Sequence, residues 1–234
     1  MYKSKKILAL IPARKGSKSI INKNLSYVGS NSLLEIAVKF VKKNRYIDYS
    51  IISSDSSKYI NLAKKYGIND YIKRKKKLSS DIAIINDVIL DTLENLNKKN
   101  LKFDILLLIE PTSPLRNNQD VLDSLKKIVC KKAYSAFTVS KVDSKFNPKK
   151  ILKIKNEKIY YNSKSGKHIQ NKQELKDSFF FKNGLIYAID ISQFMKKKLI
   201  ISSNSYPIIT KRYIANIDSV FDLKLANFLL QNEK

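Results

Sequence analysis

Ile105-Leu106-Leu107-Leu108-Ile109 is the stretch that decides the fold, because an unbroken apolar run of this length needs cover on both faces. A second run of the same kind occupies residues 7–11 and ends at Pro12. Continuous apolar strands are typical of parallel sheets that are covered by helices on both sides. Both runs are therefore predicted to be buried strands of such a sheet.

Amphipathic helices alternate with these strands along the chain. Ser32 and Glu35 have the spacing of a capping box and predict the start of a helix. Gly67 is placed to end a helix that runs from Asp55 to Tyr66. The remaining helices are expected after Asp81, around residues 121–129 and at residues 219–230, and the remaining strands at residues 50–53, 136–139, 179–189 and 207–212. This order predicts an α/β fold, in three layers, with a doubly wound and mostly parallel sheet.

Residues 141–178 interrupt the alternation. This stretch is polar and rich in lysine, and its short alternating pieces at residues 151–154 and 159–161 predict a small antiparallel ribbon. We expect one domain over residues 1–234, with residues 141–178 as an inserted excursion.

Composition limits the possible functions. The formal net charge is +26, from 46 Lys and Arg against 20 Asp and Glu, which suits nucleic acid, anionic lipid or a polyanionic small molecule. The basic run at residues 73–77 lacks interleaved aromatics, so a solvated surface is favoured over nucleic-acid binding. No segment has the length of a membrane span, and we expect a cytoplasmic protein without a membrane partner. Cys130, the only cysteine, lies in an apolar stripe and is predicted to be buried.

Ligands of such sheets bind beyond the carboxyl ends of the strands, which directs attention to the loops after Ile11, Ser53 and Ile109. The first loop, residues 12–18, contains Gly16 among basic residues. Backbone N–H groups and nearby cations there could hold a triphosphate. The loop fits neither the Walker A pattern nor G-x-G-x-x-G, and an ordinary basic turn is an equally good interpretation of these residues alone.

Two further polar segments could carry chemistry. Residues 110–116 follow the most apolar strand, and two prolines stiffen them, so the loop could hold a base or a sugar in place. The alternative is a plain turn in which Asn117 or Asn118 caps the next helix. Asn216 and Asp218 lie on one side of an extended segment and could bind Mg²⁺ together with substrate phosphates. Alternatively, Asp218 or Ser219 caps the last helix.

Together these segments resemble the acylneuraminate cytidylyltransferases, the CMP-sialic acid synthetase family. Five motifs carry the resemblance in the order and spacing of the family, from residue 7 to about residue 230. They are residues 11–18 with Asn22-Lys23-Asn24, Leu78-Ser79-Ser80-Asp81, Leu107 to Arg116, Asn183-Gly184-Leu185-Ile186-Tyr187, and Asn216-Ile217-Asp218.

The resemblance implies a nucleotide-diphospho-sugar transferase type of fold and a reaction in which a sialic-acid-like nonulosonic acid attacks the α-phosphate of CTP. It implies Mg²⁺ as the cofactor, a homodimer formed through the excursion, and no nucleic-acid partner. The implied catalytic residues are Arg14, Lys23 and Asp218. The implied CTP-binding residues are Ala13, Arg14, Gly16, Ser17, Lys18, Lys23, Asn24, Ser80 and Asp81. The implied sugar-binding residues are Glu110, Thr112, Ser113, Lys172, Gln173 and Asn183, and the implied metal ligands are Asp218 and Asn216.

The first motif departs from the family pattern at Lys15, where Gly is usual, and at Ile21-Asn22, where Pro-Gly is usual, and three further departures concern the sugar and the metal. Glu110 replaces the common Gln, Asn216 replaces the first Asp of the metal pair, and Lys172 lies where the family has Arg. These changes leave N-acetylneuraminate, legionaminate and pseudaminate open as sugars. The alternatives are another sugar nucleotidyltransferase of the same fold, such as CMP-Kdo synthetase, an inactive relative, or a non-catalytic protein that binds nucleic acid.

Overall fold

A central sheet organises the protein in the computed structural model, which describes residues 1–80, 83–163 and 178–232. In this part of the chain the sheet has seven strands in the order β11-β7-β10-β6-β1-β4-β5. Their bounds are β1 Ile7–Pro12, β4 Tyr49–Ser54, β5 Asp70–Lys73, β6 Ile105–Leu108, β7 Ser135–Lys141, β10 Phe180–Asp190 and β11 Ser205–Thr210.

The two apolar runs lie side by side in the middle of this sheet. β1 pairs with β6 in parallel, with Ile7 opposite Ile105, and pairs with β4 in parallel on its other side. β10 is antiparallel to both of its neighbours, β6 and β7, whereas β11 is parallel to β7 and β5 is parallel to β4. The prediction of a mostly parallel sheet is therefore confirmed.

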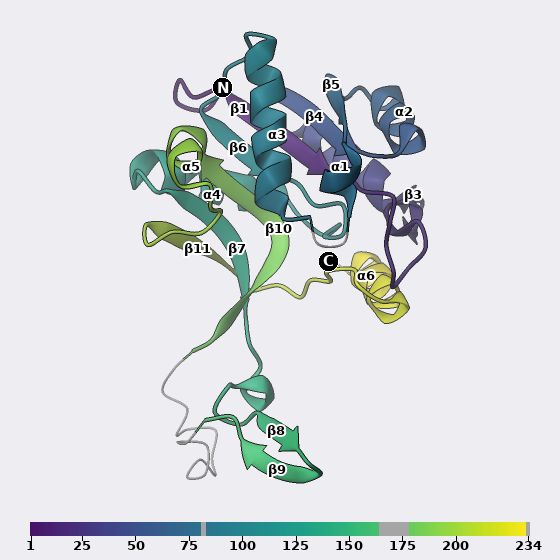
Figure 1. The fold of residues 1–234 in the computed structure, drawn as a ribbon, viewed down its shortest axis with the longest axis vertical. Helices are drawn as coiled ribbons and strands as arrows, with labels where there is room; N and C mark the ends of the chain where they lie inside the picture. The colour runs from purple at the N-terminus through teal and green to yellow at the C-terminus, as the bar shows by residue number, and fades with distance from the viewer. Residues whose placement is uncertain (81–82, 164–177, 233–234) are drawn as a thin grey trace.

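Helices cover both faces of the sheet and complete the predicted three layers (Figure 1). Ile7, Ala9 and Ile11 of β1 point to a core shared with α1, α2 and α4, whereas Leu8 and Leu10 point to a core shared with α3 and α5. The bounds are α1 Leu33–Lys43, α2 Ser57–Lys65, α3 Ile85–Lys98, α4 Asn118–Cys130 and α5 Ile191–Lys197. The alternating directions of strand side chains thus separate two apolar cores.

The predicted helix ends are mostly confirmed. The Ser32 hydroxyl accepts from the Glu35 amide at 3.3 Å, and the Glu35 carboxylate accepts from the Ser32 amide at 2.7 Å, which completes the capping box of α1. Gly67 follows α2 with φ +87°, the left-handed conformation that ends many helices. The prediction for Cys130 is wrong, because this last residue of α4 is exposed and its Sγ lies 3.5 Å from the Lys3 Nζ.

The excursion projects away from the central sheet on a stalk formed by β7 and β10 (Figure 1). It carries the predicted antiparallel ribbon as β8, Leu152–Lys155, paired with β9, Lys158–Tyr161. Part of the predicted insert, including Lys172 and Gln173, lies outside the described residues. Short elements complete the description: η1 Lys23–Leu25, β2 Tyr27–Val28, β3 Asn31–Ser32, η2 Lys76–Ser79 and η3 Ser144–Phe146.

The last helix, α6 (Val220–Asn232), lies apart from the two main cores. It packs on a third apolar cluster, whose buried members include Val28, Leu115 and Ile217. This cluster joins α6 to the segments that follow β1, β6 and β11. Across the described residues, no helix is both long and apolar enough to cross a membrane.

Candidate active site

A cavity of about 270 Å³ opens at the carboxyl ends of β1, β5 and β6, the edge of the sheet where the sequence predicted a ligand. Its walls come from segments far apart in the chain. The lining residues are Pro12, Arg14, Gly16, Ser17, Lys23, Asn24, Arg74, Leu78, Ser80, Ala83, Ile85, Val88, Glu110, Pro111 and Thr112. Much of the predicted CTP site is therefore in one place.

The loop after β1 is fixed from both sides. The Lys15 amide donates to the Asp55 carboxylate at 2.7 Å, and Asp55 follows directly after β4. The Asn24 side-chain amide donates to the Arg14 carbonyl at 2.9 Å, and Asn24 itself is buried. Ala13 is also buried, whereas Lys18 is exposed and lies outside the cavity lining. These contacts hold the turn around Gly16 in a fixed shape beside the cavity.

Lys23 connects the first motif to the last. Its Nζ donates to the Ile217 carbonyl at 2.8 Å and contacts the Asp218 carboxylate at 2.9 Å. The Lys23 side chain is only 11% exposed, whereas that of Asp218 is 79% exposed. Two residues that the sequence placed in separate motifs are thus in direct contact at the edge of the site.

The loop after β6 forms the opposite wall. Glu110 and Thr112 line the cavity, and Ser113 lies buried beneath them. The Ser113 hydroxyl lies 3.3 Å from both the Asn183 carbonyl oxygen and the Asn216 Oδ1. The bonds tie the loop to β10 and to the segment after β11.

Gly184 makes this close packing possible. Its φ is +75°, and a Cβ there would lie 2.5 Å from the Ser113 Oγ and 3.0 Å from the Glu110 Oε2. A bulge interrupts the pairing of β10 with β7 between Lys182 and Tyr187 at the same place. Only glycine combines this backbone conformation with the space required.

The electrostatics of this wall centre on Glu110. Burial raises the pKa of its carboxyl and Asp218 adds to the rise, whereas the positive charges of Arg116 and Lys182 oppose it. Arg116 is buried, and its Nη2 donates to the Glu110 carbonyl. Burial and the nearby Glu110 also raise the pKa of the Tyr187 hydroxyl. Glu110 is consequently easier to protonate than an ordinary surface glutamate.

Arg74 is a functional candidate that the sequence analysis missed. It follows β5, lines the cavity and is 8% exposed, with its Nε 2.9 Å from the Ser53 Oγ. Its Nη2 is buried and has no hydrogen-bond partner within the described part of the chain. Burial lowers the pKa of Arg74 to about 10, so it remains charged at neutral pH. The prediction that residues 73–77 form solvated surface is wrong for Arg74, which belongs to the run only in sequence.

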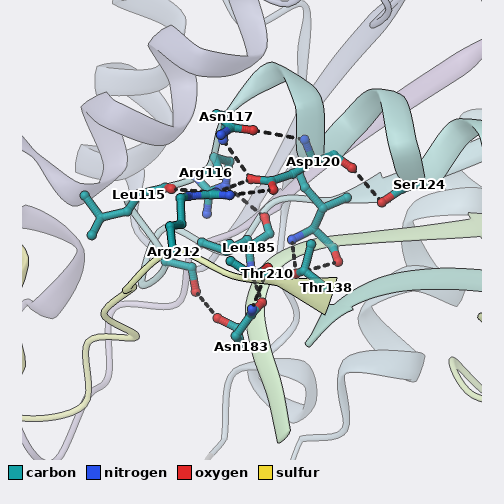
Figure 2. Close-up of polar contacts among 12 residues, drawn as sticks. Leu115, Arg116, Asn117, Asp120, Ser124, Thr138, Asn183, Leu185, Thr210 and Arg212 are labelled. Carbon is teal, nitrogen blue, oxygen red and sulfur yellow. Dashed lines mark hydrogen bonds and ion pairs between the residues drawn. The ribbon is translucent and has the colours of Figure 1, made fainter. Parts of the chain in front are cut away.

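The other predicted residues are distributed unevenly. Ser80 is exposed and lines the cavity, whereas Asp81, Lys172 and Gln173 lie outside the described residues. Asn183 is fully buried, and its side-chain amide donates to Ser140 at 3.0 Å and to Thr210 at 3.1 Å. This burial favours a role for the Asn183 side chain in joining β7, β10 and β11 over direct contact with a sugar (Figure 2).

The donors near Asp218 fit a metal that arrives with substrate. The described residues contain no group of three or more His, Cys, Asp or Glu that could hold a metal ion. Asp218 offers an exposed carboxylate, and Asn216 offers an amide oxygen beside Ser113. Mg²⁺ commonly takes one or two carboxylates and completes its shell with phosphates and water, so this small donor set suits Mg²⁺.

Comparison with known proteins assigns the chain to a family. The family model described as "Cytidylyltransferase" matches residues 8–234, which include every segment of the cavity. The chain belongs to the cytidylyltransferase family. It is therefore a nucleotidyltransferase enzyme, and the alternative of a non-catalytic protein that binds nucleic acid is disfavoured.

Relatives of this cytidylyltransferase act in nonulosonic acid activation. The chain is 24% identical over 225 residues to the pseudaminic acid cytidylyltransferase of Campylobacter jejuni, covering 96% of each chain. It is 24% identical over 222 residues to the CMP-N,N'-diacetyllegionaminic acid synthase of Legionella pneumophila, covering 91% of this chain and 90% of the relative. A CTP-complexed CMP:2-keto-3-deoxy-manno-octonic acid synthetase aligns with a TM-score of 0.69 and 15% identity over 98% of this chain and 100% of its own, which confirms the nucleotide-diphospho-sugar transferase fold.

Proposed function

We propose that this cytidylyltransferase transfers CMP from CTP to the anomeric hydroxyl of a nonulosonic acid and releases pyrophosphate. The observation that carries the proposal is the contact of Lys23, which lines the cavity, with Asp218, which does not line it but belongs to the segment of the proposed metal ligands. The matches to a pseudaminic acid and a legionaminic acid enzyme over nearly their whole lengths support the choice of sugar class.

Cations of the cavity would neutralise the triphosphate. Arg14, Lys23 and Arg74 all line the cavity, and so do Gly16 and Ser17 of the turn after β1. Nucleotidyl transfer depends on positioning and on neutralising charge around the phosphorus, so fixed guanidinium and ammonium groups lower the barrier. The orphaned Nη2 of Arg74 suits an acceptor on CTP.

Mg²⁺ is part of the proposal. Asp218 and Asn216 would hold it, and when bound it would offset negative charge on the phosphates. Lys23 would then act beside it as a second positive charge, because its Nζ already lies at Asp218. Asn216 supplies a neutral ligand instead of a second carboxylate. The phosphates of CTP would therefore provide much of the binding, and the metal would bind more weakly without CTP than with it.

The sugar would occupy the wall formed by Glu110, Thr112 and Ser113. Burial raises the pKa of the Glu110 carboxyl, which favours its neutral form relative to an ordinary glutamate, and a neutral carboxyl can donate a hydrogen bond to an anionic sugar. Such a group is compatible with two negatively charged substrates, whereas a fully ionised carboxylate would repel both. Lys172 and Gln173 remain predicted sugar contacts.

The proposal includes a homodimer through the excursion. Leu152 lies opposite Tyr161 and Ile154 lies opposite Ile159, so these four side chains share one face of the β8–β9 ribbon, and all four are exposed. An isolated two-stranded ribbon with an exposed apolar face is only marginally stable, and a second copy of the chain would cover that face. A cytoplasmic location also remains a prediction.

Pyrophosphate release tests the proposed reaction. The purified protein is incubated with CTP and Mg²⁺ against pseudaminic, legionaminic and N-acetylneuraminic acids, with Kdo as the control for a related sugar. We expect release with a nonulosonic acid and not with Kdo, and we expect it to need CTP rather than UTP. Release with Kdo alone would replace the proposed sugar, and CTP binding without release from any sugar would contradict the activity.

A further inference from the structure

An ion pair outside the cavity joins two segments that border the site (Figure 2). The Arg212 Nη1 donates to the Asp120 Oδ1 at 3.0 Å, and the Nη2 donates to the Asp120 Oδ2 at 2.5 Å. The same Nη2 also donates to the Leu115 carbonyl at 3.1 Å. Two parallel bonds from a guanidinium to a carboxylate fix both distance and orientation. Neither Asp120 nor Arg212 lines the cavity.

Asp120 belongs to a rigid part of the molecule. It is 5% exposed, and its Oδ2 also accepts from the Asn117 amide at 2.9 Å in the capping box that begins α4. α4 starts directly after the loop of residues 110–116, so Asp120 has a fixed position relative to that loop. Leu115, at the end of the loop, is held by the same guanidinium.

Arg212 belongs to the segment that carries Asn216 and Asp218, the proposed metal ligands. It lies just beyond β11, and the chain then runs from the base of the stalk to α6 (Figure 1). Further along, the Ile217 amide donates to the Thr112 carbonyl at 2.7 Å. With the contact between the Ser113 hydroxyl and the Asn216 Oδ1, the segment is therefore attached to the loop after β6 at three places: Arg212, Asn216 and Ile217.

Asp218 depends on these attachments for its position. Its side chain is 79% exposed, so packing around it contributes little to fixing it. Its backbone neighbour Ile217 is buried and bonds both to Thr112 and to Lys23. Movement of the segment at Arg212 would shift Asp218 relative to Lys23 and to the sugar wall.

We propose that Asp120 and Arg212 are positioning residues for the reaction, which hold the segment that carries Asp218 in register with the loop that carries Thr112 and Ser113. This inference rests on the proposed function. The pair acts on the alignment of the two substrates and leaves the initial binding of CTP largely alone, because Arg14 and Arg74 belong to other segments. Its loss therefore affects kcat more than KM for CTP.

Arg212→Gln and Asp120→Asn, alone and combined, test the pair kinetically. Each single variant is expected to lower kcat roughly 10- to 100-fold, the effect of a misplacement of about 1 Å, with KM for CTP changed less than about threefold. The double variant should lose no more than either single variant, because the two residues act as one unit. Arg212→Lys keeps the charge without the fork and should recover only part of the activity.

The matched control is Asp123→Asn on the same helix. Asp123 pairs with Lys126 at 3.4 Å, and the two side chains are 38% and 51% exposed. Removing this surface pair should leave kcat unchanged. Equal losses in the Asp123 and Asp120 variants, or strictly additive losses in the double variant, would overturn the positioning role.

Hydrogen exchange at the Ile217 amide gives a readout that needs no sugar. Loss of Arg212 is expected to speed this exchange at least about tenfold, because the segment is released from the Thr112 carbonyl, whereas Asp123→Asn leaves it unchanged. Unchanged exchange in Arg212→Gln would overturn the inference even if the variant melts earlier. A wild-type protein that is silent toward every sugar would contradict the proposed function, and the exchange result would still decide the role of the pair.

Discussion

At the scale of single residues, the site depends on a few positions whose neighbours leave little choice. Gly184 is confined by the Ser113 hydroxyl and the Glu110 carboxyl, and Arg74 is buried with an orphaned Nη2 at the cavity. Lys23 holds the exposed Asp218. The steric fit at Gly184, the charge of Arg74 and the protonation of Glu110 can each be tested by one substitution.

Gly184→Ala should reduce both stability and turnover. A non-glycine residue at positive φ costs about 1–2 kcal/mol, and the new methyl group would displace Ser113. The melting temperature should fall by about 2–8 °C, measured by calorimetry, and pyrophosphate release should fall with it. Gly67→Ala is the control, because Gly67 shares the positive φ but its Cβ would meet only the flexible Lys42 side chain. A Gly67 variant that lost as much turnover would contradict a local effect at Gly184.

Arg74→Met should weaken CTP binding. Removing a charged hydrogen-bond donor to a ligand costs about 1.5–3 kcal/mol, so KM for CTP should rise roughly 10- to 100-fold. Lys75→Met removes the same charge from the exposed part of the basic run and should change KM little. If both variants raise KM equally, Arg74 contributes only to the general positive field.

Glu110→Gln should change how stability depends on pH. The pKa of Glu110 is above its ordinary value of 4.5 in the folded chain, so the folded state keeps this proton to higher pH than the unfolded state. Its contribution to stability is therefore complete at acid pH and is lost as pH rises through the folded pKa. Gln cannot titrate, so the melting temperature of the variant should rise relative to the wild type as the pH increases above about 4.5. Parallel melting curves across this range would contradict the raised pKa.

At the scale of elements, the sequence predicted most of the helices and strands that carry buried apolar side chains. The runs at β1 and β6 and the amphipathic stripes of α1 to α4 follow directly from periodicity, because burial determines them. β5 and α5 were missed, since each is short and carries exposed lysines that resemble an irregular surface segment. The burial of Arg74 was missed as well, because it comes from the pairing of β5 with β4 rather than from the sequence neighbours of Arg74.

The candidate site was predicted only in part. Motif residues identified the loops at the carboxyl ends of β1 and β6, because chain order alone places those ends on one edge of the sheet. The contact of Lys23 with Asp218, the Arg212–Asp120 ion pair and the burial of Asn183 all join residues far apart in sequence. No local pattern reports such contacts, so only the folded chain shows them.

The cap of α4 can be tested as an element. Asn117 accepts from the Asp120 amide at 3.0 Å, so Asn117→Ala should cost about 1 kcal/mol and lower the melting temperature by about 2–4 °C. Asn117→Asp keeps a capping oxygen and should restore most of the loss. A full loss in both variants would show that the effect comes from something other than the cap.

At the scale of the whole molecule, the protein divides into a nucleotide-binding body and a projecting ribbon (Figure 1). Ile154→Lys with Ile159→Lys places charges on the apolar face of that ribbon and should convert the proposed dimer to single chains of 27.0 kDa. Sedimentation velocity measures the change. Lys153→Ala lies on the opposite face and should leave the dimer intact, and a wild type that sediments as a single chain would contradict the dimer.

β7 and β10 belong to both of these parts. The start of β10, from Phe180, pairs with β7 in the stalk, whereas its end, to Asp190, lies in the central sheet, and the bulge beside Gly184 separates the two halves. The bulge therefore marks the place where β10 passes from one part to the other. Mutations can accumulate in the ribbon, or a different ribbon can be recombined onto the stalk, while the nucleotide loops stay intact. An ancestral enzyme with this architecture could therefore acquire a new assembly without a change in its CTP-binding loops.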